Sequence, residues 1–188
     1  SGPRIRDAVV RALTAGGARV LDCGMASTPA MFMTTVDLGC DGAVQITASH
    51  HPSHRNGLKF FVPQGGLEGE DIEAILENAQ EGRSCTAGQP GRTEKTDYMT
   101  AYAARLRRLI VDGVGAGDQP LKGFHLLVDA GNGAGGFYAT QVLEPLGADI
   151  SGSQFLEPDG RFPNHIPNPE NEEAMASVCA ATVKAGAD

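Results

Sequence analysis

The sequence predicts an α/β protein with two consecutive mixed α/β domains, each built on a β-α-β pattern and each incomplete. Short apolar segments of strand length alternate along the chain with segments whose apolar residues recur at helical spacing. The 25 glycines among 188 residues follow no collagen-like period and are typical of many tight turns. A content of 41% hydrophobic and 20% charged residues suits a globular chain with a sizeable core.

The first domain is expected over residues 1–112. Thr28-Pro29 is typical of a helix start, and Gly16 and Gly39 are typical of helix ends. The predicted elements are a helix over 3–14, a strand over 18–23, a helix over 28–38, strands over 42–47 and 57–62, a helix over 70–80, a loop over 82–96 and a closing helix over about 97–111.

The second domain is expected over residues 121–188, after a Gly-rich linker over 113–120. Four prolines within 157–169 exclude regular structure there. The predicted elements are a strand over 124–129, a Gly-rich turn, a helix over 137–146, a strand over 149–156 and a helix from Glu170. The strand over 124–129, the helix over 137–146 and the strand over 149–156 again follow a β-α-β order.

Charge and composition exclude several classes of partner. A formal charge of -8 and a pI near 5.1, without a clustered basic segment, argue against nucleic-acid binding. No apolar run reaches 18 residues, so no membrane partner is expected. The cysteines lie far apart without metal-ligand spacing, which predicts neither a zinc site nor a disulfide scaffold. We expect a soluble, intracellular protein of the cytoplasm, with a plastid location and the oligomeric state left open.

Both ends of the chain are interpreted as cuts in a longer protein. The chain begins at Ser1 without a methionine, and it stops at Asp188 directly after a helical pattern. This interpretation matters for function, because a cut chain can lack part of a site.

The two side chains best suited to catalysis are Ser49 and Lys59. Residues 47–52, TASHHP, directly follow a predicted strand, which places Ser49 at the carboxyl end of a sheet, where α/β proteins bind ligands. Lys59 interrupts an otherwise apolar strand. A local turn hydrogen bond for Ser49 and simple outward alternation for Lys59 would also account for both residues.

Residues 47–60, TASHHPSHRNGLKF, resemble the phosphoserine loop of the α-D-phosphohexomutases, which include phosphoglucomutases and phosphomannomutases. That loop usually carries T-A-S-H-N-P followed by N-G-x-K, and the spacing from Ser49 to Lys59 matches. His51 stands where the family often has Asn, and no role is assigned to it. Other segments agree in the same order: SGP at 1–3, STP at 27–29, LVDAGNGAGG at 127–136 and PDGRFPNHIPNP at 158–169.

The resemblance implies a four-domain enzyme of which this chain covers most of the first domain and the first part of the second. The serine loop belongs to the first domain and a D-x-D-x-D-R metal loop to the second, with sugar recognition in the third and phosphate binding in the fourth. No D-x-D-x-D-R occurs in this sequence. The isolated chain is therefore expected to be inactive.

The resemblance also implies roles for individual residues. Ser49 would carry the phosphoryl group, Lys59 would act as general acid and base, and His50 would help to position groups or move protons. Magnesium would bind through the phosphate on Ser49, and a hexose bisphosphate would be the intermediate or activator, with hexose phosphates as partners. The remaining loop residues expected to hold the loop or contact phosphate are Thr47, Ala48, Arg55 and Asn56.

Two other functions compete with this interpretation. Gly131, Gly133 and Gly136 satisfy G-x-G-x-x-G after a strand and before a helix, and Glu157 follows at the distance seen in dinucleotide-binding oxidoreductases. The second competing interpretation is a mutase-like fragment without catalytic activity. Within the PDGRFPNHIPNP segment, Asn164 and His165 are expected to satisfy backbone groups, and Asp129 to cap the Gly-rich turn.

Overall fold

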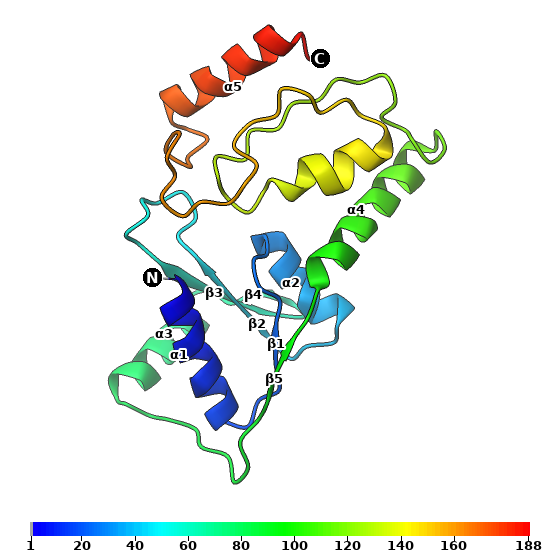
Figure 1. Ribbon diagram of the computed structural model, residues 1–188. Coiled ribbons are helices and arrows are strands. Elements are labelled where there is room, and N and C mark those ends of the chain that lie inside the picture. Colours follow the sequence, from blue (N-terminus) through cyan, green and yellow to red (C-terminus); the bar gives the residue numbers. More distant parts are fainter. Residues whose placement is uncertain (1) are drawn as a thin grey trace. The chain divides into compact units, whose positions relative to one another are not determined.

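Helices and short strands alternate through the first half of the chain, as the sequence predicts (Figure 1). The computed structural model describes residues 2–188. The chain divides into two units, one made of Ser1–Thr47 and Asn56–Tyr98, the other of Ala48–Arg55 and Met99–Asp188. The prediction of an α/β protein with mixed domains is confirmed. The elements of the first unit are α1 (Gly2–Ala15), β1 (Val20–Asp22), α2 (Thr28–Asp37), β2 (Ala43–Thr47), β3 (Gly57–Val62), β4 (Gly65–Gly66), α3 (Glu70–Gln80) and β5 (Thr93–Lys95).

Local sequence accounts for the start of α2. Ser27 caps the helix, because its hydroxyl accepts a hydrogen bond from the amide of Ala30 at 3.4 Å, and Pro29 occupies the first turn. Ala30 is fully buried where α2 packs on β2 and β3, and the ring of Phe32 meets that of Phe61 at 5.8 Å. This helix therefore anchors the hairpin from which the serine loop leaves.

The β5 strand contradicts the loop expected over 82–96. β5 pairs in parallel with β1, Val20 opposite Thr93. Glu94 forms a two-pronged ion pair with Arg19, with hydrogen bonds of 3.0 and 2.6 Å. A three-residue polar segment carries no strand signal of its own, so it becomes a strand only through its partner.

The two strands that flank α2 lie in different sheets. Within residues 2–188, β1 pairs only with β5, whereas β2, β3 and β4 form an antiparallel sheet in that order. Consequently α2 connects two sheets, and the expected first β-α-β unit does not close on a single sheet. The strand boundaries themselves lie within two residues of those predicted.

The second unit contains α4 (Tyr98–Val114), η1 (Tyr138–Leu143), η2 (Glu144–Leu146) and α5 (Glu172–Ala185). Its core is formed by Ala103 of α4 with Val142 and Leu146, all at most 2% exposed. Further apolar side chains packed on this core are Leu106, Ile110, Val111, Leu121, Phe137 and Tyr138. The apolar stripe of α4 is therefore buried against the segment that follows it.

The strands expected over 124–129 and 149–156 are not formed as continuous strands. The two segments run in parallel, but they meet only at two bridges, His125 with Asp149 and Asp129 with Gln154. Between these bridges the second segment turns at Gly152, with a φ of 87°, and the hydroxyl of Ser153 accepts the amide hydrogen of Val128 at 3.0 Å. A side chain thus replaces one step of the backbone ladder.

The helix expected over 137–146 is present but is not a regular α-helix. η1 is a wide π-helical turn, and η2 is a tight 3₁₀ turn that contains Pro145. Proline has no N–H and cannot continue a helical hydrogen-bond ladder. A guanidinium N–H of Arg107 donates to the carbonyl of Gln141 within η1.

Among residues 2–188, no helix combines the length and the apolar character that crossing a membrane requires.

The turn at Gly91 gives a test of the first unit. A Cβ on Gly91 would lie 1.8 Å from the carbonyl oxygen of Ala18, next to β1, whereas a Cβ on Gly88 would meet nothing within 4 Å. We expect Gly91→Ala to lower the free energy of unfolding by about 2 kcal/mol through forced separation of β1 and β5. Gly88→Ala should change it by less than about 0.5 kcal/mol.

Urea unfolding followed by circular dichroism, with hydrogen exchange of the β1 amides, measures both variants. Equal stability of the two variants would show that the pairing of β1 with β5 does not require the close approach of Gly91 to Ala18.

Candidate active site

The serine loop spans the end of the β2–β3 hairpin. Thr47 is paired with Gly57 at the last position of the ladder, so residues 48–56 connect the two strands. A Cβ on Gly57 would lie 3.0 Å from the carbonyl oxygen of Thr47. A side chain at this position would push the strands apart by a few tenths of an ångström, so glycine suits the point where the loop returns to the sheet.

Ser49 has a backbone conformation that serine rarely adopts. Its φ is 54°, in the left-handed region, which costs on the order of 1 kcal/mol for a residue with a Cβ. The amide of His51 donates to the carbonyl of Ala48 at 2.9 Å, and that of Arg55 donates to Pro52 at 2.9 Å. Two tight turns thus hold the loop, and left-handed serine is typical of functional segments.

Ser49 and His50 are brought together. The Ser49 hydroxyl oxygen lies 3.3 Å from Nδ1 of His50, and both side chains are exposed. The His50 ring in turn lies against that of His51, with centroids 4.6 Å apart. This arrangement gives a solvent-accessible hydroxyl a neighbouring group that can accept or donate a proton, and His51 supports the ring that does so.

Lys59 lies on β3 opposite Gln45. Because side chains alternate along a strand, Lys59 shares its face of the sheet with Phe61, the residue that packs on α2. Lys59 is exposed, and within residues 2–188 its ammonium group makes no hydrogen bond or ion pair. The side chain of Arg55 is also exposed and likewise has no such partner among these residues.

The described residues do not provide a magnesium centre by themselves. Within residues 2–188, no group of three or more His, Cys, Asp or Glu side chains is placed to hold a metal ion. Magnesium prefers several oxygen ligands in octahedral geometry, which a phosphate on Ser49 alone would not supply.

The Gly-rich turn is filled by the protein's own atoms. A Cβ on Gly136 would lie 1.9 Å from the carbonyl oxygen of Leu156, and one on Gly131 would lie 3.0 Å from Cε1 of His165. The backbone carbonyl of Glu157 accepts a hydrogen bond from the Asn132 amide at 2.9 Å. These glycines allow close packing within the unit.

Asp129 and His165 form a buried ion pair that sequence reasoning did not find. Nε2 of His165 lies 3.0 and 3.1 Å from the two Asp129 carboxylate oxygens, and the side chains are 11% and 8% exposed. Asp129 also accepts from the amide of Gly131 at 2.8 Å and from Gln154 at 2.8 Å. Asp129 therefore caps the turn as expected, but nothing in the local sequence links it to a histidine 36 residues away.

The partners of His165 favour its cationic form. Nδ1 lies 2.9 Å from the carbonyl oxygen of Ile166, while Nε2 faces the Asp129 carboxylate. The imidazolium ion can donate from both ring nitrogens, which suits a carbonyl and a carboxylate as partners. The Ile166 carbonyl and the Asp129 carboxylate together raise the pKa of His165 above its usual value, although burial opposes them. Asn164 completes the cluster by donating to Asn132 at 2.7 Å.

Comparison with known proteins identifies the class of this chain. Residues 1–84 match the family model described as phosphoglucomutase/phosphomannomutase, alpha/beta/alpha domain I, and residues 100–188 match domain II of the same family. A crystal structure of a phosphoglucomutase/phosphomannomutase family protein from Burkholderia thailandensis superposes with a TM-score of 0.83 at 30% identity, over 100% of this chain and 40% of that one.

Two relatives match the whole chain at 34% identity. One is a phosphomannomutase/phosphoglucomutase of Pseudomonas putida, of which the chain covers 38%, and the other is a phosphoglucosamine mutase of Kineococcus radiotolerans, of which it covers 41%. The chain belongs to the phosphoglucomutase/phosphomannomutase family. It spans about two fifths of the length of these relatives.

The His165 ion pair predicts a pH dependence. Because the pKa of His165 is raised in the folded state, its stabilising contribution is full below the unfolded pKa and is lost as pH rises through the folded pKa. We expect His165→Gln to lower the free energy of unfolding by about 2 kcal/mol near pH 6 and by less near pH 8. His54→Gln, an exposed histidine, should lower it at neither pH.

Urea unfolding at both pH values, with NMR titration of the His165 ring, tests this expectation. A His165 pKa at or below the ordinary value of a histidine would contradict the stabilising ion pair with Asp129.

Proposed function

We propose that a protein containing this chain is a phosphohexomutase that interconverts hexose 1-phosphate and hexose 6-phosphate through a phosphoserine at Ser49. The observation that carries the proposal is the exposed Ser49 hydroxyl, held in a left-handed turn 3.3 Å from an imidazole nitrogen. Membership of the phosphoglucomutase/phosphomannomutase family supports it. The partners would be hexose phosphates.

In the proposed reaction, phosphoserine 49 gives its phosphoryl group to a free sugar hydroxyl. The bond from phosphorus to the Ser49 oxygen breaks, a bond to the sugar oxygen forms, and the sugar proton passes to a base. The resulting bisphosphate turns around and returns its other phosphoryl group to Ser49, so the net change is an isomerisation. Lys59 acts as the general acid and base in these proton transfers, with His50 beside the serine oxygen.

In the proposed reaction, cationic side chains neutralise the negative charge of the transferring phosphoryl group. The transferring phosphoryl group carries two negative charges, and positioning plus neutralisation supply most of the acceleration in such reactions. In this proposal Arg55 contacts phosphate, while Thr47, Ala48 and Asn56 hold the loop; the pairing of Thr47 with Gly57 at the strand ends supports the second role. Magnesium is the expected cofactor of the whole protein, and the isolated chain is expected to be inactive, since its described residues lack a set of carboxylate ligands.

Replacing the proposed nucleophile tests the mechanism. Ser49→Ala should lower kcat for the conversion of glucose 1-phosphate to glucose 6-phosphate by at least about a thousandfold, because no group remains to hold the phosphoryl. Peptide mass spectrometry should find phosphate on Ser49 of the wild-type protein. Ser53→Ala, in the same exposed loop, is the matched control and should keep both the phosphate and most of the activity.

Unchanged activity in Ser49→Ala would refute the phosphoserine mechanism. Absence of activity and of phosphate in every protein would instead favour a mutase-like protein without catalysis.

Lys59 gives an independent test. If Lys59 transfers protons, Lys59→Gln should lower kcat by about 10² to 10⁴ while leaving the fold intact, because the residue is exposed and its side chain has no protein partner. Lys95→Gln, an exposed lysine on β5, provides the control. Circular dichroism and the pH profile of kcat measure fold and proton transfer separately. An unchanged kcat would assign the acid and base role elsewhere.

A further inference from the structure

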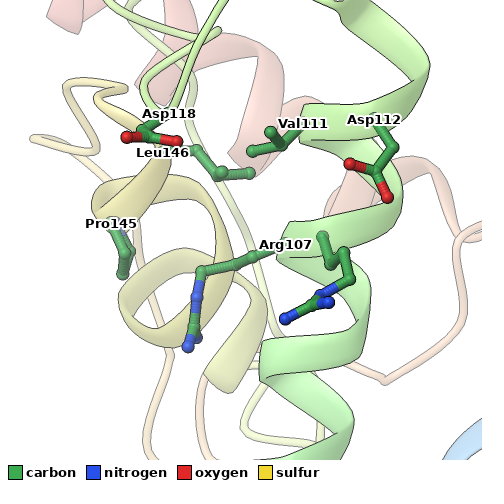
Figure 2. Close-up of a pocket in the computed structure, with 7 residues that line it drawn as sticks. Arg107, Val111, Asp112, Asp118, Pro145 and Leu146 are labelled. Atoms are coloured by element: carbon green, nitrogen blue, oxygen red, sulfur yellow. The ribbon is translucent and has the colours of Figure 1, made fainter.

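The second unit contains a pocket of about 350 Å³ that none of the proposed phosphoserine residues lines (Figure 2). Arg107, Arg108 and Asp112 of α4 form one wall. Asp118 and Pro145 lie opposite, and the floor is apolar, with Val111 and Leu146. Pockets of this volume suit small metabolites, and four charged side chains around an apolar floor offer polar groups that could orient one.

Arg107 is held at this pocket by η1. One of its guanidinium N–H groups donates to the backbone carbonyl of Gln141. A guanidinium group has five N–H donors, so the others remain for a second acceptor. This hydrogen bond positions a cation at the pocket.

The remaining charges in the pocket are not paired with each other. Within residues 2–188, the side chains of Arg108, Asp112 and Asp118 make no hydrogen bond or ion pair. Figure 2 shows the carboxylates of Asp112 and Asp118 toward one end of the pocket, with Arg107 reaching toward the other. Opposite charges kept apart across a cavity provide two different ends for one ligand.

We propose that this pocket binds a small phosphorylated polyol of the size of a hexose monophosphate. The phosphate lies on the guanidinium groups of Arg107 and Arg108, whose planar donors match phosphate oxygens. The sugar hydroxyls donate to Asp112 and Asp118, since carboxylates accept hydroxyl protons but repel a second phosphate. The ligand class follows from the pocket's own charges, so the site does not depend on catalysis at Ser49.

The experiment uses the full-length protein that contains this chain, carrying Ser49→Ala so that added sugar phosphate is not converted. NMR of the arginine Nε–Hε groups follows titration with glucose 6-phosphate, inorganic phosphate and glucose. We expect saturable shifts of the Arg107 and Arg108 signals with glucose 6-phosphate, weaker binding of inorganic phosphate and none of glucose. Arg108→Ala should weaken glucose 6-phosphate binding, read at Arg107, by about tenfold or more.

Two further variants sharpen the test. Asp118→Asn should weaken glucose 6-phosphate binding but not phosphate binding, because it affects only the hydroxyl end. Arg11→Ala, an exposed arginine of α1, should change neither. No saturable shift at Arg107, or equal binding by the Arg108→Ala variant, would overturn the proposal. Mutase activity without pocket binding would refute this inference alone, and pocket binding without mutase activity in the protein with Ser49 intact would refute the proposed function alone.

Discussion

The antiparallel register between β2 and β3 determines where the strands end and which face carries Lys59. The serine loop leaves the sheet at Thr47 and re-enters it at Gly57, because these two residues are paired. Lys59 lies opposite Gln45, and this pairing fixes the face of the sheet that carries the lysine. A slip of one residue would move every side chain of one strand to the other face. The register is held by α2, whose Phe32 meets Phe61 on that face. Packing on the hairpin therefore positions residues that themselves touch little of the core.

In the second unit, side chains compensate for interruptions of the backbone pairing. The hydroxyl of Ser153 accepts from the amide of Val128 where the parallel pairing is interrupted at Gly152. The Asp129 carboxylate accepts from the Gly131 amide and the Gln154 side chain and pairs with His165 at the Gly-rich turn. A buried polar group without a partner costs roughly 1 to 3 kcal/mol, so these part-buried contacts stabilise the irregular backbone.

Local signals predicted the helices and the hairpin, because caps, glycines and apolar periodicity act within a few residues. Ser27 and Pro29 at the start of α2 are an example. The same reasoning missed β5, which depends on Arg19 pairing with Glu94 75 residues away, and it predicted continuous strands in the second half, where Gly152 breaks the pairing. The serine loop could be found from its motif. The Asp129–His165 pair could not, because neither residue carries a local sign of the other.

The distribution of partners separates structural polar residues from those suited to bind substrate. Asp129, His165 and Gln154 are hydrogen-bonded to one another, to Ser177 and to the backbone, so a ligand contact there would compete with existing hydrogen bonds. Lys59 and Arg55 are exposed and have no side-chain partner within residues 2–188, so a ligand contact at either residue would break no such bond.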